Sequence, residues 1–501
     1  MTIEFQRQKK ILIVGGGTAG WMAANLIASR WGNVEVCLLE SAEIGIIGVG
    51  EGSTPHLKLF FDSIGVSESE WMPRCNATYK NGISFAKWSF VPGFEEYFHP
   101  FPAQTDEFTV PIFFNHVKAR IHGHNVNAHP DNYFLETYLT RKNLGPIPAE
   151  SFPFSVAYGY HFDAALVGKF LAEKAIGRGV KRIFGTLTEV VLSANGAIAA
   201  VRLNDDNLLT ADFFIDCSGF KSLLLQDALN VSFKSYKENL FNDAAVVMPS
   251  AISEIIPPAT KATALSNGWA WKIPLTNRYG NGYVYSTDYI TPDQAETELR
   301  QHLGLLDNNV SARHLRMNVG RAEKHWEKNC LAVGLSQGFI EPLEATALAL
   351  SFETIMLFIK YYENGAYSNK FETVFNEEIN TKFDGVRDYI VCHYKANQRK
   401  DTDYWKDNAV NTNISDKLNK ILYLWRTSQN FAQDMHAHNL QGSYQAKSWA
   451  CLLAGYGVLP PLDLNAKNKH YNSPHDMDQL ADFIRRCGLN FNTHNELLCI
   501  N

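Results

Sequence analysis

The stretch Ile11-Leu-Ile-Val-Gly-Gly-Gly-Thr-Ala-Gly20 decides the fold of this chain. Its apolar residues are typical of a buried strand, and Trp21–Arg30 suits a helix, so a strand, a glycine turn and a helix are predicted. Gly15 is expected to make the tight turn, Gly17 to let the backbone approach a pyrophosphate, and Gly20 to let helix and strand pack closely. The helix N-terminus is expected to bind the phosphates, which predicts a dinucleotide-binding unit.

Later segments indicate which dinucleotide binds. A second apolar strand, residues 34–39, ends at Glu40, where an acidic residue can meet ribose hydroxyls. A buried strand that ends at Asp216 is followed by Gly219, and another apolar strand ends at Gly334. Three strand-to-glycine junctions over more than 300 residues suit a large flavoprotein, so FAD is favoured over NAD. The fold class expected is α/β, with a Rossmann-like FAD-binding unit of the flavoprotein monooxygenase type.

Composition limits the function further. The 501 residues are 46% apolar and 12% aromatic, enough for a large core. A formal charge of −6 without long blocks of like charge gives no electrostatic case for nucleic acid or an anionic membrane. The eight cysteines lack CxxC spacing, so neither a metal site nor a disulfide framework is expected. A cytoplasmic location is expected, because a reducing compartment suits this cysteine usage.

The hexapeptide Trp269-Ala-Trp271-Lys-Ile-Pro274 places two indoles two residues apart. In a strand both indoles lie on one face, because side chains alternate with period two. They can wall off one side of a site. An ordinary aromatic core strand explains the same pattern.

Two further segments carry candidate chemistry. The first runs Asn76-Ala-Thr-Tyr-Lys80-Asn-Gly and contains a lysine that could equally be a solvated turn residue. The second runs Gly334-Leu-Ser-Gln-Gly-Phe-Ile-Glu-Pro-Leu343-Glu344-Ala-Thr-Ala347 and leads into a helical pattern from about residue 345 to 362. Thr346 and Ala347 then lie in the first helical turn, where free N–H groups and the helix dipole favour an anion. The alternative for Glu344 is that it caps this helix, since carboxylates are favoured there.

A glycine-rich loop, Ile44-Gly-Ile-Ile-Gly48-Val49-Gly50-Glu51-Gly-Ser-Thr-Pro55, has the freedom to lie against a cofactor and to move with its redox state. A plain glycine-rich turn is the alternative.

These segments, which follow one another along the chain, resemble motifs of the flavin-dependent tryptophan halogenase family. Residues 269–274 resemble its WxWxIP signature, residues 338–346 its GFxEPLEST segment, and residues 48–51 its GVGE strap over the flavin. The resemblance implies that Lys80 and Glu344 are catalytic and that the amides of Thr346 and Ala347 contact a halide. The cofactor-binding residues expected are Gly15, Gly17, Thr18, Ala19, Gly20, Glu40, Gly48, Val49, Gly50, Glu51, Asp216, Gly219, Gly334 and Leu343.

The resemblance also implies a mechanism and partners. Reduced FAD from a separate NADH-dependent flavin reductase, oxygen and a halide ion (bromide or chloride) give hypohalous acid. This acid travels to Lys80 and halogenates an electron-rich aromatic such as indole, while Trp269 and Trp271 keep the flavin from acting directly on the substrate. The rival functions are a FAD-dependent monooxygenase or hydroxylase on the same fold, and a non-catalytic flavin-binding protein.

The chain departs from the family pattern at two positions. The family's serine after the glutamate is Ala345, and its glycine after the threonine is Ala347. A methyl group at residue 347 changes the shape of the halide pocket. A site tuned to bromide or iodide is a hypothesis that follows, because larger halides are less strongly hydrated and easier to oxidise.

The expected substrate is a small aromatic rather than tryptophan. No Asp or Glu occurs between Asp434 and Asp463, where tryptophan-specific members hold the amino-acid group with acidic residues. An unpaired ammonium group is costly to desolvate. Free indole, an indole derivative or a phenol is therefore expected. The candidates for the substrate side are Trp269, Trp271, Pro274, His99, Phe98, Tyr160, His161, Tyr444 and Trp449, although each could be merely structural.

The expected organisation is a FAD-binding core over residues 1–400 and a helical substrate-side region over 401–501 packed on it. The nucleotide unit within the core is discontinuous, over residues 1–65, 152–220 and 320–362. An added β-sheet forms the substrate side. A homodimer is compatible with the sequence.

Overall fold

Strand β1 (Lys10–Val14) lies inside a six-stranded sheet of the computed structural model, which describes residues 9–42, 50–460 and 476–499. The order of strands is β21 (Trp326–Glu327), β22 (Cys330–Ala332), β13 (Phe213–Asp216), β1, β2 (Glu35–Glu40) and β9 (Lys181–Phe184). All neighbours pair in parallel except β21 and β22. Parallel strands are buried on both faces, which explains the apolar runs in the sequence.

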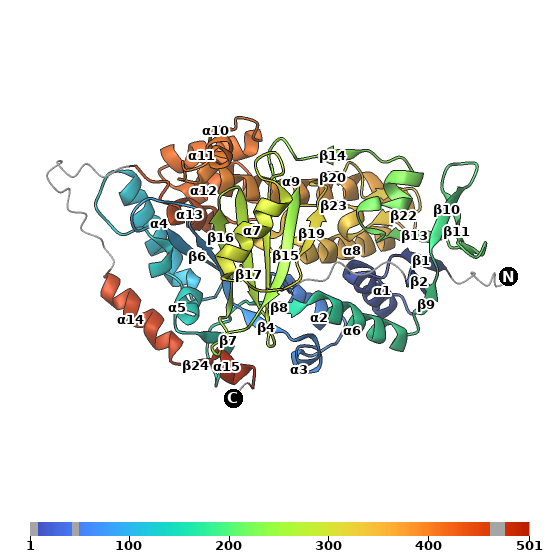
Figure 1. Cartoon of the computed structure of the whole chain (residues 1–501), viewed down its shortest axis with the longest axis horizontal. Helices are drawn as coiled ribbons and strands as arrows, with labels where there is room; N and C mark the ends of the chain where they lie inside the picture. The colour runs from blue at the N-terminus through green and yellow to red at the C-terminus, as the bar shows by residue number, and fades with distance from the viewer. Residues whose placement is uncertain (1–8, 43–49, 461–475, 500–501) are drawn as a thin grey trace.

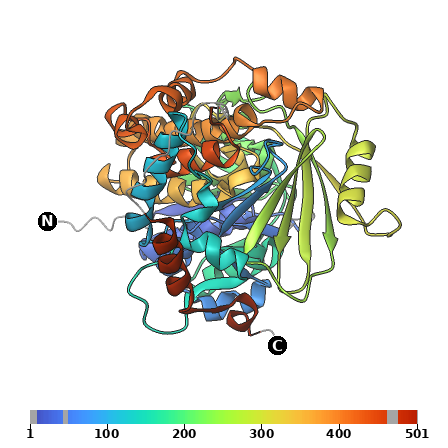
Figure 2. The ribbon, with the colours of Figure 1, turned by 90° about the vertical axis from the view of Figure 1, so that its left-hand side faces the viewer.

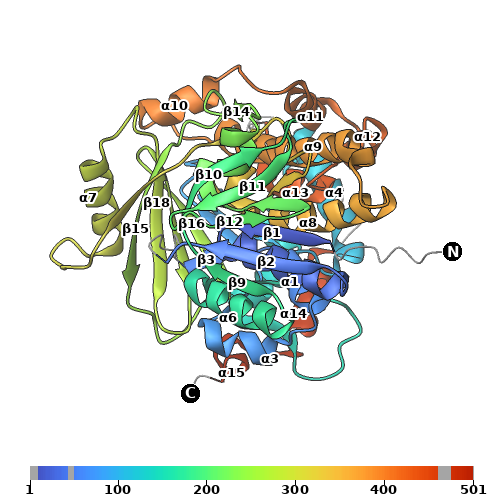
Figure 3. The same ribbon diagram turned by 90° about the vertical axis from the view of Figure 1, so that its right-hand side faces the viewer.

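The two faces of β1 pack against different layers. Ile11 and Ile13 belong to the main core with helix α1 (Thr18–Arg30), which packs between α6 (Ala164–Gly177) and α8 (Ala347–Asn364). Leu12 and Val14 face a second cluster that includes residues of the three-stranded sheet β10 (Leu187–Leu192), β11 (Ile198–Leu203) and β12 (Leu208–Thr210). Figure 3 shows the helices and this small sheet around β1 and β2. The six-stranded sheet is thus built from three separate parts of the sequence.

A separate seven-stranded sheet lies at the centre of Figure 1, and its yellow-green strands are seen side by side in Figure 2. Its order is β19 (Arg313–Arg316), β15 (Ala244–Ser250), β18 (Tyr279–Tyr285), β17 (Gly268–Pro274), β16 (Ala259–Leu265), β5 (Gly82–Ala86) and β6 (Glu96–Pro100). On β17, Trp269 and Trp271 share a face, with ring centroids 5.9 Å apart.

Strand β8 (Gly159–Asp163) is the middle strand of a further three-stranded sheet. It pairs antiparallel with β3 (Gly50–Gly52) on one side and with β4 (Thr78–Lys80) on the other. His161 lies opposite both Gly52 and Thr78. The end of the glycine-rich loop and the Lys80 segment are therefore two strands apart.

Helices dominate the C-terminal part, coloured orange to red in Figure 1. The long α9 (Glu372–Ala396) is followed by α10 (Asp403–Val410), α11 (Asp416–Thr427), α12 (Phe431–Ala437), α13 (Ala446–Gly455) and α14 (Met477–Gly488). Helix α13 packs on β6 and on α9. No helix within residues 9–42, 50–460 and 476–499 is both long and apolar enough to span a bilayer.

The remaining elements fill the connections. The helices are α2 (His56–Ser63), α3 (Glu68–Trp71), α4 (Asp106–Ile121), α5 (Leu135–Arg141), α7 (Pro292–Leu303) and α15 (His494–Leu497), and the strands are β7 (Leu144–Pro148), β14 (Phe233–Ser235), β20 (Gly320–Ala322), β23 (Gly338–Phe339) and β24 (Phe491–Thr493).

The register of β17 and β18 predicts that a side chain at Gly282 lowers the stability of the protein. Trp271 pairs with Gly282, and a Cβ on Gly282 would lie 2.2 Å from Trp271 Cζ2. Gly282→Ala is expected to lower the free energy of unfolding by about 1–3 kcal/mol, because the indole must move. Thermal denaturation measures this loss. Gly32→Ala is the matched control, because its added methyl group would meet nothing within 4 Å; equal melting temperatures for the two variants would refute the packing argument.

Candidate active site

A cavity of about 970 Å³ extends from the glycine turn after β1 to the side chain of Lys80. Loops after the strands of the six-stranded sheet line one end, and β3, β16 and β17 line the other. Its described lining includes residues 14–20, 39–42, 50–52, 217–221, 333–335 and 345–348, together with Leu343, Thr260, Trp269 and Trp271.

The glycine turn fits a dinucleotide. Gly15 has φ +121°, and a Cβ there would lie 2.0 Å from the carbonyl oxygen of Cys217. A Cβ on Gly20 would lie 2.0 Å from the Gly15 oxygen, whereas one on Gly17 would meet no protein atom within 4 Å. Gly17 is the N-cap of α1 and supplies no side-chain cap, so the N–H groups of Thr18 and Ala19 open onto the cavity. This arrangement suits a pyrophosphate.

Glu40 lies at the end of β2 and lines the same end of the cavity. Its carboxylate forms an ion pair with Arg182, which also lines the cavity. A Cβ on Gly16 would overlap the carboxylate of Glu40, so that glycine makes room for the acidic side chain. The position of Glu40 suits the ribose of the adenosine half.

Asp216 does not line the cavity, which corrects the expectation of a direct cofactor contact. It is fully buried, and its carboxylate accepts hydrogen bonds from the hydroxyls of Ser218, Ser222 and Ser336 and from the N–H groups of Leu224 and Leu225. The carboxylate therefore ties together the loops that carry Gly219 and Gly334. Both glycines do line the cavity, with φ of +79° and +70°.

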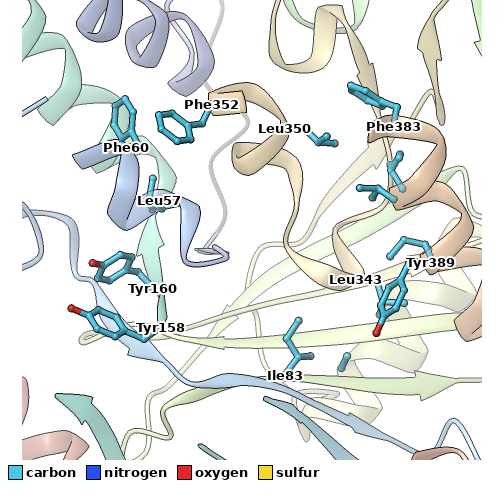
Figure 4. Packing of buried hydrophobic residues seen from close by; sticks show 14 of the residues in the cluster. Leu57, Phe60, Ile83, Tyr158, Tyr160, Leu343, Leu350, Phe352, Phe383 and Tyr389 are labelled. Carbon is cyan, nitrogen blue, oxygen red and sulfur yellow. The ribbon is translucent and has the colours of Figure 1, made fainter. Parts of the chain in front are cut away.

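The other expected cofactor residues divide into two groups. Gly50, Glu51 and Leu343 line the cavity. Gly48 and Val49 lie outside the described residues. Burial, and to a smaller extent the charge of Asp163, raises the pKa of Glu51 to about 7. Leu343, Tyr389 of α9 and Ile83 of β5 belong to one cluster of buried hydrophobic side chains, part of which Figure 4 shows.

The expected halide residues lie where the helix begins. Thr346 is the N-cap of α8 and Ala347 is its first residue, and both line the cavity. Ala345 precedes them with φ +56°, in the left-handed region. That turn aims the start of the helix at the cavity, where its N–H groups favour an anion.

Lys80 ends β4, and its side chain is completely buried. Its Nζ makes no hydrogen bond with any residue that the structure describes. Nζ and Thr260 Oγ1 each lie 3.3 Å from the point where a Cβ on Gly52 would stand. Burial lowers the pKa of Lys80 from its ordinary 10.5 to about 7, and the charge of Glu344 partly opposes this. Lys80 is thus a dry amine at the end of the cavity.

Glu344 does not cap α8. It lies in the short turn before that helix and is 6% exposed, and its Oε1 lies 2.9 Å from His393 Nε2 on α9. Burial raises the pKa of Glu344, opposed by the charges of His99 and Lys80. Glu344 is not among the described cavity-lining residues.

Aromatic side chains gather around Tyr389, whose ring centroid lies 5.4 Å from that of His393. Tyr444 stacks on Tyr389 with ring centroids 3.6 Å apart, and Trp449 meets Tyr389 edge to face at 4.8 Å. The Tyr389 hydroxyl lies 3.4 Å from His99 Nδ1. His99, Tyr444 and Trp449 thus all contact Tyr389, and none of the three is among the described cavity-lining residues.

The two indoles of β17 line the cavity and are held differently. Trp269 Nε1 donates to Glu341 Oε2 over 2.8 Å, and Glu341 also accepts from Tyr394 and Asn242. Trp271 Nε1 has no partner among the described residues. Pro274 lies at the end of β17, where its carbonyl accepts from Thr78 Oγ1. The sequence pattern did not identify Glu341 or His393 as residues of the site. His393 lies four residues after Tyr389, so the two side chains share one face of a helix.

Fold and cavity define a dinucleotide-binding protein, and comparisons with known proteins narrow the class. A family model described as tryptophan halogenase matches residues 10–468. A tryptophan 6-halogenase of Streptomyces toxytricini is 36% identical, over 83% of this chain and 84% of that protein. A tryptophan 7-halogenase of Lentzea aerocolonigenes is 32% identical, over 90% of each. The solved structure of a tryptophan C-6 flavin-dependent halogenase (chlorinase) from taromycin biosynthesis superimposes with a TM-score of 0.85 at 34% identity, over 98% of this chain and 99% of that one.

The chain belongs to the tryptophan halogenase family. It is therefore an enzyme, an oxidoreductase that depends on a flavin and a halide.

The glycine turn generates a prediction about cofactor binding. Gly17→Ala is expected to leave the melting temperature of the cofactor-free protein unchanged, because its methyl group would meet no protein atom. The same substitution is expected to weaken FAD binding by about tenfold or more, since the methyl group stands where a pyrophosphate approaches. Flavin fluorescence titration and thermal denaturation measure the two effects.

Gly20→Ala is the comparison variant. It is expected to lower the melting temperature even without FAD, because its Cβ would lie 2.0 Å from the Gly15 oxygen. Unchanged FAD affinity in Gly17→Ala would show that the phosphates lie elsewhere.

Proposed function

We propose that this protein halogenates free indole or a similar small aromatic, with Lys80 and Glu344 as its catalytic residues. The observation that carries the proposal is the buried Lys80 amine, which makes no hydrogen bond with the described residues and lines the same cavity as the dinucleotide cradle. Membership of the tryptophan halogenase family supports the reaction type.

Reduced FAD, when bound, supplies the electrons with which oxygen and halide are converted to hypohalous acid. The residues expected to hold it are those of the glycine turn, Glu40, Gly219, Gly334 and Leu343. The described residues build one dinucleotide cradle, so we assign the supply of electrons to a separate NADH-dependent flavin reductase.

Trp269 and Trp271 separate two chambers in this proposal. They line the cavity on the substrate side, and the bond from Trp269 Nε1 to Glu341 fixes one indole. An aromatic substrate beside Glu344 then stays apart from the flavin. Hypohalous acid is small enough to pass along the cavity to Lys80.

The Lys80 ammonium gives a proton to the oxygen of hypohalous acid, which leaves as water when the halogen bonds to a ring carbon, and Lys80 is neutral until a proton returns to it. The ring carbon then loses its proton, which Glu344 accepts. The sum is ring C–H plus hypohalous acid giving ring C–halogen plus water. A neutral amine can instead react with hypohalous acid to a haloamine, so the pH dependence of turnover distinguishes the two routes.

Free indole is favoured over tryptophan by the residues around Glu344. The segment between Asp434 and Asp463 has no carboxylate, and its Tyr444 is stacked on Tyr389. Asp106 of α4 is paired with Lys447 of α13 at 2.6 Å. An amino-acid ammonium group therefore lacks an evident partner in this segment, and burying it is costly.

Replacing Lys80 tests the proposal. With flavin reductase, NADH, FAD, bromide and indole, Lys80→Met is expected to reduce formation of bromoindole by about a hundredfold or more, because the group that directs the halogen is lost. A soluble scavenger should still trap free hypohalous acid at the wild-type rate. Mass spectrometry of the products measures the first effect, and Lys272→Met, which removes an exposed cation of β17, is the matched control.

Stability separates this loss from misfolding. Between pH 7 and 10.5 the unfolded Lys80 binds a proton that the folded one does not, so stability of the wild type rises with pH in that window. Lys80→Met lacks this penalty and is expected to be the more stable protein at pH 7. Oxygen instead of bromine in the product would favour the hydroxylase alternative and end the proposal.

Halide preference is the second test. The methyl group of Ala347 at the start of α8 lines the cavity, and a larger, less strongly hydrated halide is expected to be preferred there. With indole at equal chloride and bromide concentrations, we expect bromoindole in excess, and a smaller excess for Ala347→Gly. A clear preference of the wild type for chloride would contradict the assignment.

A further inference from the structure

A chain of hydrogen bonds leads away from Glu344 into the core. Glu344 Oε1 lies 2.9 Å from His393 Nε2, and His393 Nδ1 lies 2.7 Å from the Tyr456 hydroxyl. His393 is completely buried, and Tyr456 is 1% exposed. The chain joins three elements, since Glu344 precedes α8, His393 is on α9 and Tyr456 follows α13.

The partners fix where the protons lie. Burial lowers the pKa of His393 well below its ordinary value, so the imidazole is neutral and carries one N–H. An ionised Glu344 can only accept, which assigns that N–H to Nε2. Nδ1 then accepts, and the Tyr456 hydroxyl must donate to it. Tyr456 therefore selects the tautomer in which His393 donates to Glu344.

The second carboxylate oxygen differs. Glu344 Oε2 makes no hydrogen bond with the described residues, and it is not among their fully enclosed unpartnered atoms. One oxygen of Glu344 is thus held by the core, and the other retains its lone pairs and some access.

We propose that His393 is a positioning residue, which holds Glu344 through Oε1 so that Oε2 takes the proton released by the aromatic ring, and that Tyr456 fixes the tautomer this requires. The inference rests on the proposed function of Glu344 and specifies how that carboxylate works. Protonation at Oε2 leaves Oε1 able to accept from His393 as a carbonyl oxygen, so the chain survives the proton transfer without rearrangement. No other atom in this series of hydrogen bonds changes its bonding.

Other titratable groups face Glu344. They are Lys80 on β4, Tyr97 and His99 on β6, Tyr389 and His393 on α9, Tyr444 before α13 and Tyr456 after it. Burial lowers the pKa of His99 to about 4, so His99 is neutral near pH 7. Burial raises the pKa of all four tyrosines well above the ordinary value, so they are neutral as well. Among the groups that face Glu344, Lys80, with its pKa of about 7, also contributes to the pH profile.

The test compares pH profiles of kcat for bromination of indole. His393→Phe keeps a flat ring but removes the donor to ionised Glu344, so the acid limb of the profile is expected to move to higher pH by about one unit. At pH 7, kcat is expected to fall about tenfold or more, while KM for indole and trapping of free hypohalous acid stay unchanged. His393→Gln, whose amide can donate to the same oxygen, is expected to restore part of the acid limb. Tyr456→Phe is expected to shift the limb in the same direction by less.

Tyr97→Phe is the matched control. Tyr97 is equally buried and faces the same carboxylate, but its hydroxyl makes no hydrogen bond to Glu344 or to His393. Its profile is expected to match that of the wild type. An unshifted acid limb in His393→Phe, with a melting temperature close to the wild type, would overturn the inference. A shift equal to that of His393→Phe in Tyr97→Phe would also overturn it, because the effect would then be general packing.

Failure of the inference is distinguishable from failure of the proposed function. If Glu344 has no role in halogenation, the wild type and Glu344→Gln form bromoindole at equal rates. If only the inference fails, Glu344→Gln loses activity while His393→Phe keeps the wild-type profile.

Discussion

The structure depends on keeping the amine of Lys80 out of water while leaving it open to one cavity. Burying an ammonium group without a partner is strongly unfavourable, and here the result is a pKa lowered to about 7. The large apolar core around the sheets offsets the cost of burying the Lys80 amine. The fold thereby holds a reactive group that would otherwise be a hydrated surface lysine.

Close approach of backbones creates the rest of the site. Gly15 and Gly20 let the first strand and helix meet, and Gly282 leaves room for the indole of Trp271. Asp216 holds two loops together from behind the cavity wall instead of touching a ligand. The site is built from these supports as much as from the residues that face it.

Strands and helices with strong local patterns were predictable from the sequence. The apolar run at residues 11–14 and the glycines after it identified the nucleotide unit, and the helix expected from about residue 345 runs from Ala347 to Asn364. The role of Asp216 was not predictable, because a strand-ending aspartate looks the same whether it turns toward a ligand or toward the protein. The partners of Glu344 were also hidden. His393 is 49 residues away along the chain, and no local pattern links it to Glu344.

The shared strand β8 has a mechanical consequence. Because β3 and β4 are both hydrogen-bonded to it, and His161 lies opposite Gly52 and Thr78 at once, the loop end and the lysine segment form one stiff plate. Neighbouring strands lie about 4.8 Å apart and share ladder hydrogen bonds. A displacement of β3 therefore either moves β8 and β4 with it or breaks those hydrogen bonds. A ligand that displaces Gly50–Gly52 from the cavity side therefore also displaces Lys80, through β8.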